Sequence, residues 1–186
     1  VDAYLVDLLC VEGVNRVSLG GQSFDRSKLR WLERDHNEIC LQNSFELLHK
    51  KIDVVSMDLI FGTPGETVTK WKKDVEQLLD LKPNHISIYG LTIEKGTSFF
   101  GRLRRGEFEL PSEEVQREMY LLARHQLQSQ GYEHYEVSNF ALPGFHCRHN
   151  TTYWLGAPYY AAGPGAARYI DGRREVNHRS TITYLK

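Results

Sequence analysis

The sequence predicts an α/β fold in which parallel strands form part of a barrel. Strand and helix patterns alternate from residue 14 to about residue 94, and this βαβαβ order implies parallel strands joined by right-handed crossovers. Each predicted strand carries polar residues on one face, unlike the apolar runs of an open sheet that is covered on both faces. Polar inward faces suit a barrel whose lumen binds a ligand, near the carboxyl ends of the strands.

The three strands are predicted at residues 14–22, 54–62 and 85–94. Successive side chains of a strand point to opposite faces, so each strand should have an apolar and a polar face. The apolar faces of the first two strands carry Val17, Leu19, Met57, Leu59 and Phe61. Their opposite faces carry Arg16, Ser18, Gly20, Gln22, Ser56, Asp58 and Ile60.

Helical patterns connect these strands. A short helix should begin at a cap near Asp25 or Ser27, and a second helix near Asn37. Between the second and third strands, an apolar stripe at helical spacing predicts a helix that ends before Pro83. This stripe consists of Trp71, Val75, Leu78 and Leu79.

After the third strand the pattern changes. A loop with several glycines leads to a helix that should begin at Pro111 and end at Gly131, and short strand-like pieces alternate with turns from there on. We therefore expect a boundary near residue 100, with the barrel in residues 1–100 and a linker helix and accessory region in residues 101–186. Only about three βα units are visible, so we expect a fragment that forms half a barrel at most.

Composition limits the classes of partner. A formal net charge of −1 argues against a broad nucleic-acid surface, which needs an excess of Lys and Arg. No apolar run approaches the roughly 18 residues that span a bilayer, although peripheral association with a membrane stays open. Cys10, Cys40 and Cys147 are widely spaced, which favours reduced thiols in a cytoplasmic compartment. The oligomeric state cannot be predicted.

Three short segments are rich in aromatic residues, His, Asn and Gly: residues 135–141, 147–154 and 163–166. The middle one reads Cys147-Arg148-His149-Asn150-Thr151-Thr152-Tyr153-Trp154. With residues 13–24, 58–67 and 91–97, these segments resemble the oxygen-independent coproporphyrinogen III oxidase-like (HemN-related) family of radical S-adenosylmethionine (SAM) proteins. Within that family, the middle segment is similar to the HemW-type haem chaperones.

The resemblance implies a partial (β/α)6 barrel, followed by a small α+β C-terminal domain, and a SAM site. By resemblance, Gln22, Arg34 and Asp58 hold SAM. A guanidinium fork can clamp the methionine carboxylate, while an amide and a carboxylate suit the ribose hydroxyls or the amino group. The residues alone leave two alternatives open, namely a surface ion pair of Arg34 with Glu33 or Asp35, and a capping role for Asp58.

The same resemblance places Gly90 and Thr92 at another wall of the SAM pocket. Ala167 stands where HemW-like sequences commonly have a histidine. The imidazole that the family offers there is therefore absent, and only backbone contact with SAM is expected at Ala167.

His149 is the candidate ligand of haem iron, with Tyr153 and Trp154 covering a face of the porphyrin. The alternative is a buried histidine that hydrogen-bonds to Tyr153 or Asn150. A zinc site is disfavoured, because His146, Cys147 and His149 have no second pair of ligands elsewhere in the sequence.

The family also uses a [4Fe–4S] cluster, which three closely spaced cysteines hold. No such set occurs here, so the cluster ligands are expected outside this chain, and the chain by itself should be catalytically silent. The resemblance implies a haem-binding chaperone that delivers haem to recipient haemoproteins, located in the cytoplasm or, in a eukaryote, in mitochondria. The alternative is an oxygen-independent coproporphyrinogen III oxidase-like radical SAM enzyme.

Overall fold

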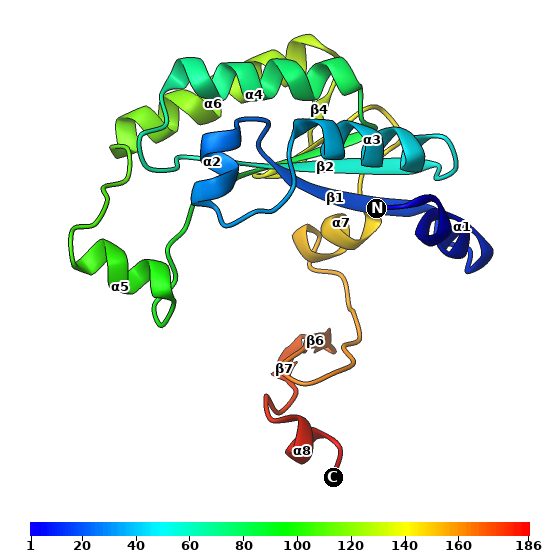
Figure 1. Ribbon diagram of the computed structural model, residues 1–186. Helices are drawn as coiled ribbons and strands as arrows, with labels where there is room; N and C mark the ends of the chain where they lie inside the picture. The colour runs from blue at the N-terminus through cyan, green and yellow to red at the C-terminus, as the bar shows by residue number, and fades with distance from the viewer. The chain divides into compact units, whose positions relative to one another are not determined.

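The computed structural model describes residues 1–186, which form two compact units, residues 1–146 and residues 147–186. The helices are α1 (Ala3–Val11), α2 (Arg26–Trp31), α3 (Glu38–His49), α4 (Val68–Leu81), α5 (Ser98–Arg104), α6 (Glu113–Ser129), α7 (Arg148–Trp154) and α8 (Thr181–Tyr184) (Figure 1). The strands are β1 (Arg16–Gln22), β2 (Val54–Phe61), β3 (His85–Gly90), β4 (Glu133–His134), β5 (Asn139–Ala141), β6 (Ala167–Ile170) and β7 (Arg173–Val176). None of the helices combines the length and the apolarity needed to cross a bilayer.

The five strands of the first unit form one sheet in the order β1-β2-β3-β5-β4. Strands β1, β2 and β3 run parallel, as predicted, whereas β5 pairs antiparallel with β3 and β4 pairs antiparallel with β5. The third strand is shorter than predicted, because β3 ends at Gly90 rather than Glu94. Strand β2 ends at Phe61, whose carbonyl oxygen accepts from the Leu91 N–H, so the chain beyond Leu91 has no further residue of β2 to pair with.

Helices cover one face of this sheet, and Figure 1 shows α3, α4 and α6 on the same side of it. The strand residues that pack beneath them are buried and apolar: Val55, Met57, Leu59, Phe61, Ile86, Ile88 and Phe140. The opposite face carries Ser18, Asp58 and Tyr89, which are at least partly accessible. The predicted division into an apolar and a polar face is therefore confirmed, and it agrees with a barrel wall that has its helices outside.

Side-chain caps explain where α2 and α3 begin. Asp25 Oδ1 accepts a hydrogen bond from the backbone N–H of Lys28, so Asp25 rather than Ser27 caps α2. Asn37 caps α3 in the same way, as predicted. Helix α4 ends at Leu81, before Pro83, which also agrees with the sequence.

Two short helices of the first unit are not predicted by the sequence. Helix α1 buries only Val6, and α5 buries no residue at all. A helix of seven to nine residues that packs so little needs no apolar stripe, and periodicity therefore cannot reveal it.

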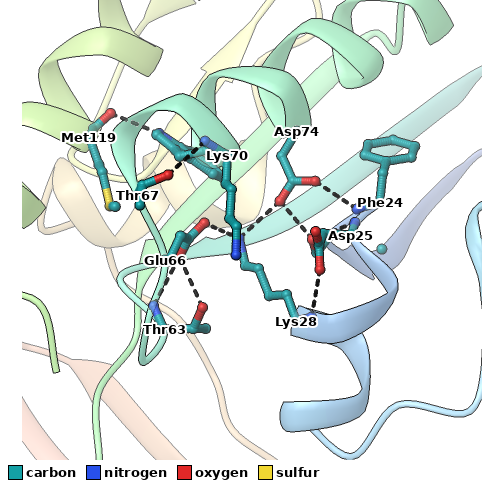
Figure 2. Close-up of polar contacts among 12 residues, drawn as sticks. Phe24, Asp25, Lys28, Thr63, Glu66, Thr67, Lys70, Asp74 and Met119 are labelled. Carbon is teal, nitrogen blue, oxygen red and sulfur yellow. Dashed lines mark hydrogen bonds and ion pairs between the residues drawn. The ribbon is translucent and has the colours of Figure 1, made fainter. Parts of the chain in front are cut away.

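A buried charged cluster of Lys28, Glu66 and Asp74 fastens α2 to α4 and to the loop after β2 (Figure 2). Lys28 Nζ lies 2.5 Å from Glu66 Oε1 and 2.9 Å from Asp74 Oδ2, and the three side chains are at most 6% exposed. Asp74 also accepts from the backbone N–H of Phe24, and Glu66 from that of Thr63. Because each carboxylate has further donors, the cost of burying these charges is offset, and the cluster fixes the loops at the carboxyl ends of β1 and β2.

The second unit consists of α7, the antiparallel hairpin of β6 and β7, and α8. Strand-like pieces were expected throughout this region, so the prediction is wrong for α7 and α8, neither of which buries a residue. The two units divide after His146 and not near residue 100, because α6 packs on α4 and β5 extends the sheet. The assignment of residues 1–100 and 101–186 to separate family domains stays a prediction.

Candidate functional site

A β-bulge at the carboxyl end of β1 sets the position of Gln22. The register with β2 shifts between Gly20 and Gln22, and Gln22 takes the left-handed conformation with φ of 61°. Gly21 faces the core, where a Cβ would lie 2.9 Å from Leu41 Cδ2, so a larger residue would require the Leu41 side chain to shift. The Gln22 amide folds back over Gly20, since Nε2 lies 2.8 Å from the position that a Gly20 Cβ would take. Such strained backbone is common at binding sites.

Asp58 lies on the polar face of β2, where two serines hold it. Ser18 Oγ is 2.8 Å from each of its carboxylate oxygens, and Ser56 Oγ is 3.4 Å from Oδ1. The carboxylate stays partly accessible, and Asp58 lies inside the strand, so the alternative of a turn or helix cap is excluded. Gly20 is the register partner of Asp58, so the Gln22 amide, which lies over Gly20, is on the polar face that also carries Asp58.

Arg34 lies in the loop between α2 and α3, which is anchored at the same end of β1. His36 Nε2 donates to the Gly21 carbonyl oxygen at 2.9 Å, and the Arg34 backbone N–H donates to Leu29. The Arg34 side chain is exposed and forms no ion pair with its acidic neighbours in the sequence. Glu33 instead approaches Arg102 at 3.8 Å. The guanidinium is thus available to a ligand.

Gly90 and Thr92 lie at the carboxyl end of β3 and just beyond it. A Cβ at Gly90 would lie 3.3 Å from the ring of Phe61, which would have to shift by a few tenths of an ångström, and the SAM contact of Gly90 stays a prediction. Thr92 is exposed and borders an apolar hollow with Trp31 and Leu91. No hydrogen bond joins Thr92 to Gln22, Arg34 or Asp58, and its place in a common site stays a prediction.

His85 and Tyr135 form part of a polar chain that the sequence does not reveal. His85 is 3% exposed, and its Nδ1 lies 2.7 Å from Ser56 Oγ while its Nε2 lies 2.6 Å from the Tyr135 hydroxyl. Burial, together with the positive charges of Arg16 and His146, lowers the pKa of His85 to about 4. The ring is therefore neutral at neutral pH. A histidine at the start of a strand with a polar face was the only signal available.

The haem candidates lie on α7 in the second unit. The rings of His149 and Tyr153 meet edge to face, with centroids 4.8 Å apart and an interplanar angle of 83°. Tyr153 also contacts Tyr159, at a centroid distance of 4.4 Å. His149 is exposed and Trp154 is 60% exposed, which excludes the alternative of a buried histidine and leaves an imidazole open to a ligand.

Ala167 is the first residue of β6, where it pairs with Val176. The remaining SAM candidates lie in the first unit, whereas Ala167 lies in the second. Its expected backbone contact with SAM stays a prediction.

The three cysteines are not arranged as cluster ligands. Cys10 belongs to α1, Cys40 to α3, and Cys147 precedes α7, and none of them is in a disulfide. No group of three or more His, Cys, Asp or Glu side chains converges as a metal site. The residues of this chain therefore do not fit a [4Fe–4S] cluster.

Comparison with curated proteins identifies relatives, although no protein-family model matches the chain. The chain is 42% identical over 183 residues to "Heme chaperone HemW" of Lactococcus lactis, covering 98% of this chain and 48% of that protein. For the protein of the same name from Bacillus subtilis, identity is 35% over 178 residues, covering 95% and 47%. The chain thus spans about half the length of these relatives.

Comparison with solved structures concerns the fold. Coproporphyrinogen III oxidase (HemN) from Escherichia coli, described as a radical SAM enzyme, matches with a TM-score of 0.79 at 20% identity, covering 97% of this chain and 44% of that one. Elp3 of Methanocaldococcus infernus matches with a TM-score of 0.58 at 28% identity, covering 66% and 29%. The predicted partial radical SAM barrel is therefore confirmed, and by its sequence the chain belongs to the HemW family of radical SAM proteins.

Proposed function

We propose that the protein is a haem-binding chaperone that delivers haem to haemoproteins and that also binds SAM and a [4Fe–4S] cluster. The observation that carries this proposal is an identity of 35–42% with relatives named heme chaperone HemW, over nearly the whole chain. The similarity to HemN supports a coproporphyrinogen III oxidase-like enzyme less well, because 20% identity reflects the fold alone. Radical oxidation of coproporphyrinogen III by the intact protein would favour that enzyme.

The polar face at the carboxyl ends of β1 and β2 has the groups that SAM requires. The Gln22 amide can donate and accept, and Asp58 accepts, which suits ribose hydroxyls or the amino group of SAM. Arg34 offers an unpaired fork for the methionine carboxylate. SAM bound with a cluster would supply radical chemistry, whereas the residues of this chain would bind and orient it.

A substitution at Arg34 tests this SAM site in the intact protein. Arg34→Ala should weaken SAM binding by roughly 1.5–3 kcal/mol, the range for a hydrogen bond to a charged group. Arg34→Lys should recover only part of the loss, because an ammonium cannot form the bidentate fork. Arg30→Ala, which removes another exposed arginine from α2, is the matched control. Unchanged affinity in Arg34→Ala, measured by calorimetry, would refute the role of this residue.

The exposed His149 on α7 supports the haem site. An imidazole is a common axial ligand of haem iron, and Tyr153 and Trp154 offer partly exposed rings of 46% and 60% exposure beside it. The compartment is proposed to be reducing, in keeping with three cysteines outside disulfides. Relatives from zebrafish and cattle carry the word mitochondrial in their names, and a eukaryotic origin would place this protein there too.

Haem titration tests this second site. His149→Ala should shift or abolish the Soret band of the haem complex while leaving the circular dichroism unchanged. His178→Ala is the control, because His178 is another exposed histidine of the second unit. A wild-type spectrum and affinity in His149→Ala would show that haem binds elsewhere.

A further inference from the structure

We propose that His85 is a positioning residue that acts on Asp58 through Ser56. In the tautomer with its proton on Nδ1, His85 turns the Ser56 hydroxyl toward Asp58 and so fixes the carboxylate for its ligand. In this tautomer the Tyr135 hydroxyl can donate to the free Nε2 on the other side of the ring. The inference rests on the proposed SAM site, to which it adds three residues that act on Asp58 rather than on SAM.

The chemistry of the groups sets the direction of each hydrogen bond. A carboxylate only accepts, so Ser56 must donate its hydroxyl proton if it bonds to Asp58 Oδ1 at 3.4 Å. The Ser56 oxygen is then free to accept from His85 Nδ1–H at 2.7 Å. Nε2 is left with a lone pair and accepts the Tyr135 hydroxyl proton at 2.6 Å. All three protons of the chain thus point toward Asp58.

The other tautomer is disfavoured by the charge of Asp58. If His85 carried its proton on Nε2, the Ser56 hydroxyl would donate to Nδ1. The lone pairs of the Ser56 oxygen would then face the carboxylate, and Ser18 would be its remaining hydroxyl donor, at 2.8 Å. Ser56 is buried, so such a contact between its lone pairs and the negative charge is unfavourable.

The groups around His85 keep its ring neutral, as the chain requires. Arg16 from β1 donates to the carbonyl oxygen of Phe145 at 2.5 Å and lies near enough to act on the ring by its charge. The ring of His146 stacks on that of Tyr135, with centroids 4.4 Å apart, and its Nε2 pairs with Glu133 at 2.7 Å. A protonated ring would carry hydrogen on both nitrogens and could not accept from Tyr135.

The tautomer can be measured without SAM. In protein labelled with 15N-histidine, long-range 1H–15N correlations at pH 7 should show His85 protonated on Nδ1 and unprotonated on Nε2. The peaks are assigned by their loss in His85→Asn. A ring protonated on Nε2, or on both nitrogens, would overturn the inference whatever the protein binds.

SAM affinities of the intact protein test the link to Asp58. Ser56→Ala and His85→Leu should each weaken binding about threefold to tenfold, the range expected for one hydrogen bond. The double variant should be no weaker than either single variant, because both break the same chain. His85→Asn should restore binding, since its amide N–H can take the place of Nδ1–H. Ser87→Ala is the matched control, because Ser87 is the register partner of Asp58 in β3 but is not part of the chain.

Two outcomes separate the inference from the proposed function. If Asp58→Ala leaves SAM affinity unchanged, the SAM site itself is wrong and the inference falls with it. If Asp58→Ala weakens binding while Ser56→Ala and His85→Leu do not, only the inference is overturned. Additive losses in the double variant would also overturn it. Tyr135→Phe, which leaves no hole, should weaken binding less than His85→Leu and provides a check if the latter fails to fold.

Discussion

The charged cluster of Lys28, Glu66 and Asp74 and the neutral chain of Ser56, His85 and Tyr135 are two ways to bury polar groups in one unit. The cluster lies between α2 and α4 and balances two carboxylates with a lysine and backbone N–H donors. The chain lies on the polar face of the sheet and keeps its histidine uncharged. The comparison shows two different uses of buried polar groups. Opposite charges hold loops together, whereas a neutral chain of hydrogen bonds fixes the tautomer of its histidine.

The largest effect is expected when the charged cluster loses its cation. Lys28→Met would leave two carboxylates buried together, so the free energy of unfolding should fall by about 3–5 kcal/mol in urea titrations. Lys70→Met is the matched control, because Lys70 is an exposed lysine of α4 and its loss should change stability by at most about 0.5 kcal/mol. A loss below about 1 kcal/mol in Lys28→Met would mean that the cluster does not hold the loops.

For the neutral chain, the expected effect is instead a loss of stability at low pH. The unfolded chain protonates His85 near its ordinary pKa of 6.5, but the folded protein only near 4. The unfolded form therefore binds the proton first, and stability should fall by about 3 kcal/mol as pH decreases from 6.5 to 4, with no further loss below that. Unfolding of wild type and His85→Asn, measured across this window, isolates the contribution of His85. If the free energy of unfolding changed with pH in the same way in both proteins, the lowered pKa of His85 would be contradicted.

The smallest effect is expected for an exposed ion pair. Comparing it with the buried cluster distinguishes the effect of charge from the effect of burial. Arg168 and Glu175 face each other across β6 and β7, with Nη2 and Oε2 2.5 Å apart and side chains about half exposed. Water and salt screen such a pair, so Arg168→Gln should cost at most about 1 kcal/mol in thermal unfolding, and less in high salt. A loss as large as that of Lys28→Met would show that burial is not the deciding variable.

Periodicity was sufficient for the elements that bury apolar surface. The faces of β1 and β2 follow the period of two, and the stripe of α4 includes Trp71 and Val75, which are fully buried. The same reasoning failed for α5 and α7, because helices that bury nothing leave no pattern. Periodicity also does not predict that β5 pairs with β3. The two strands are far apart in the sequence, and they meet because α6, which lies between them in the sequence, packs on α4.

For the candidate site, the sequence predicts on which face of its strand a residue lies, but not which residues of other strands it contacts. Asp58 lies on the polar face as its place in the alternation requires. The partnership of Ser56, His85 and Tyr135 depends on strand register and on contacts across 29 and 50 positions of sequence, which no local pattern contains. The bulge at Gly20 and Gln22 is likewise invisible to a strict period of two.

The left-handed backbone at Gln22 affects both the stability of the fold and the candidate site. A residue other than glycine in that conformation costs on the order of 1 kcal/mol, so Gln22→Gly should make the fold more stable. The same change would remove the amide that lies over Gly20, the register partner of Asp58. If Gln22 binds SAM as proposed, stability and ligand recognition compete at this position, and selection for thermal robustness alone would remove a group that binds the ligand.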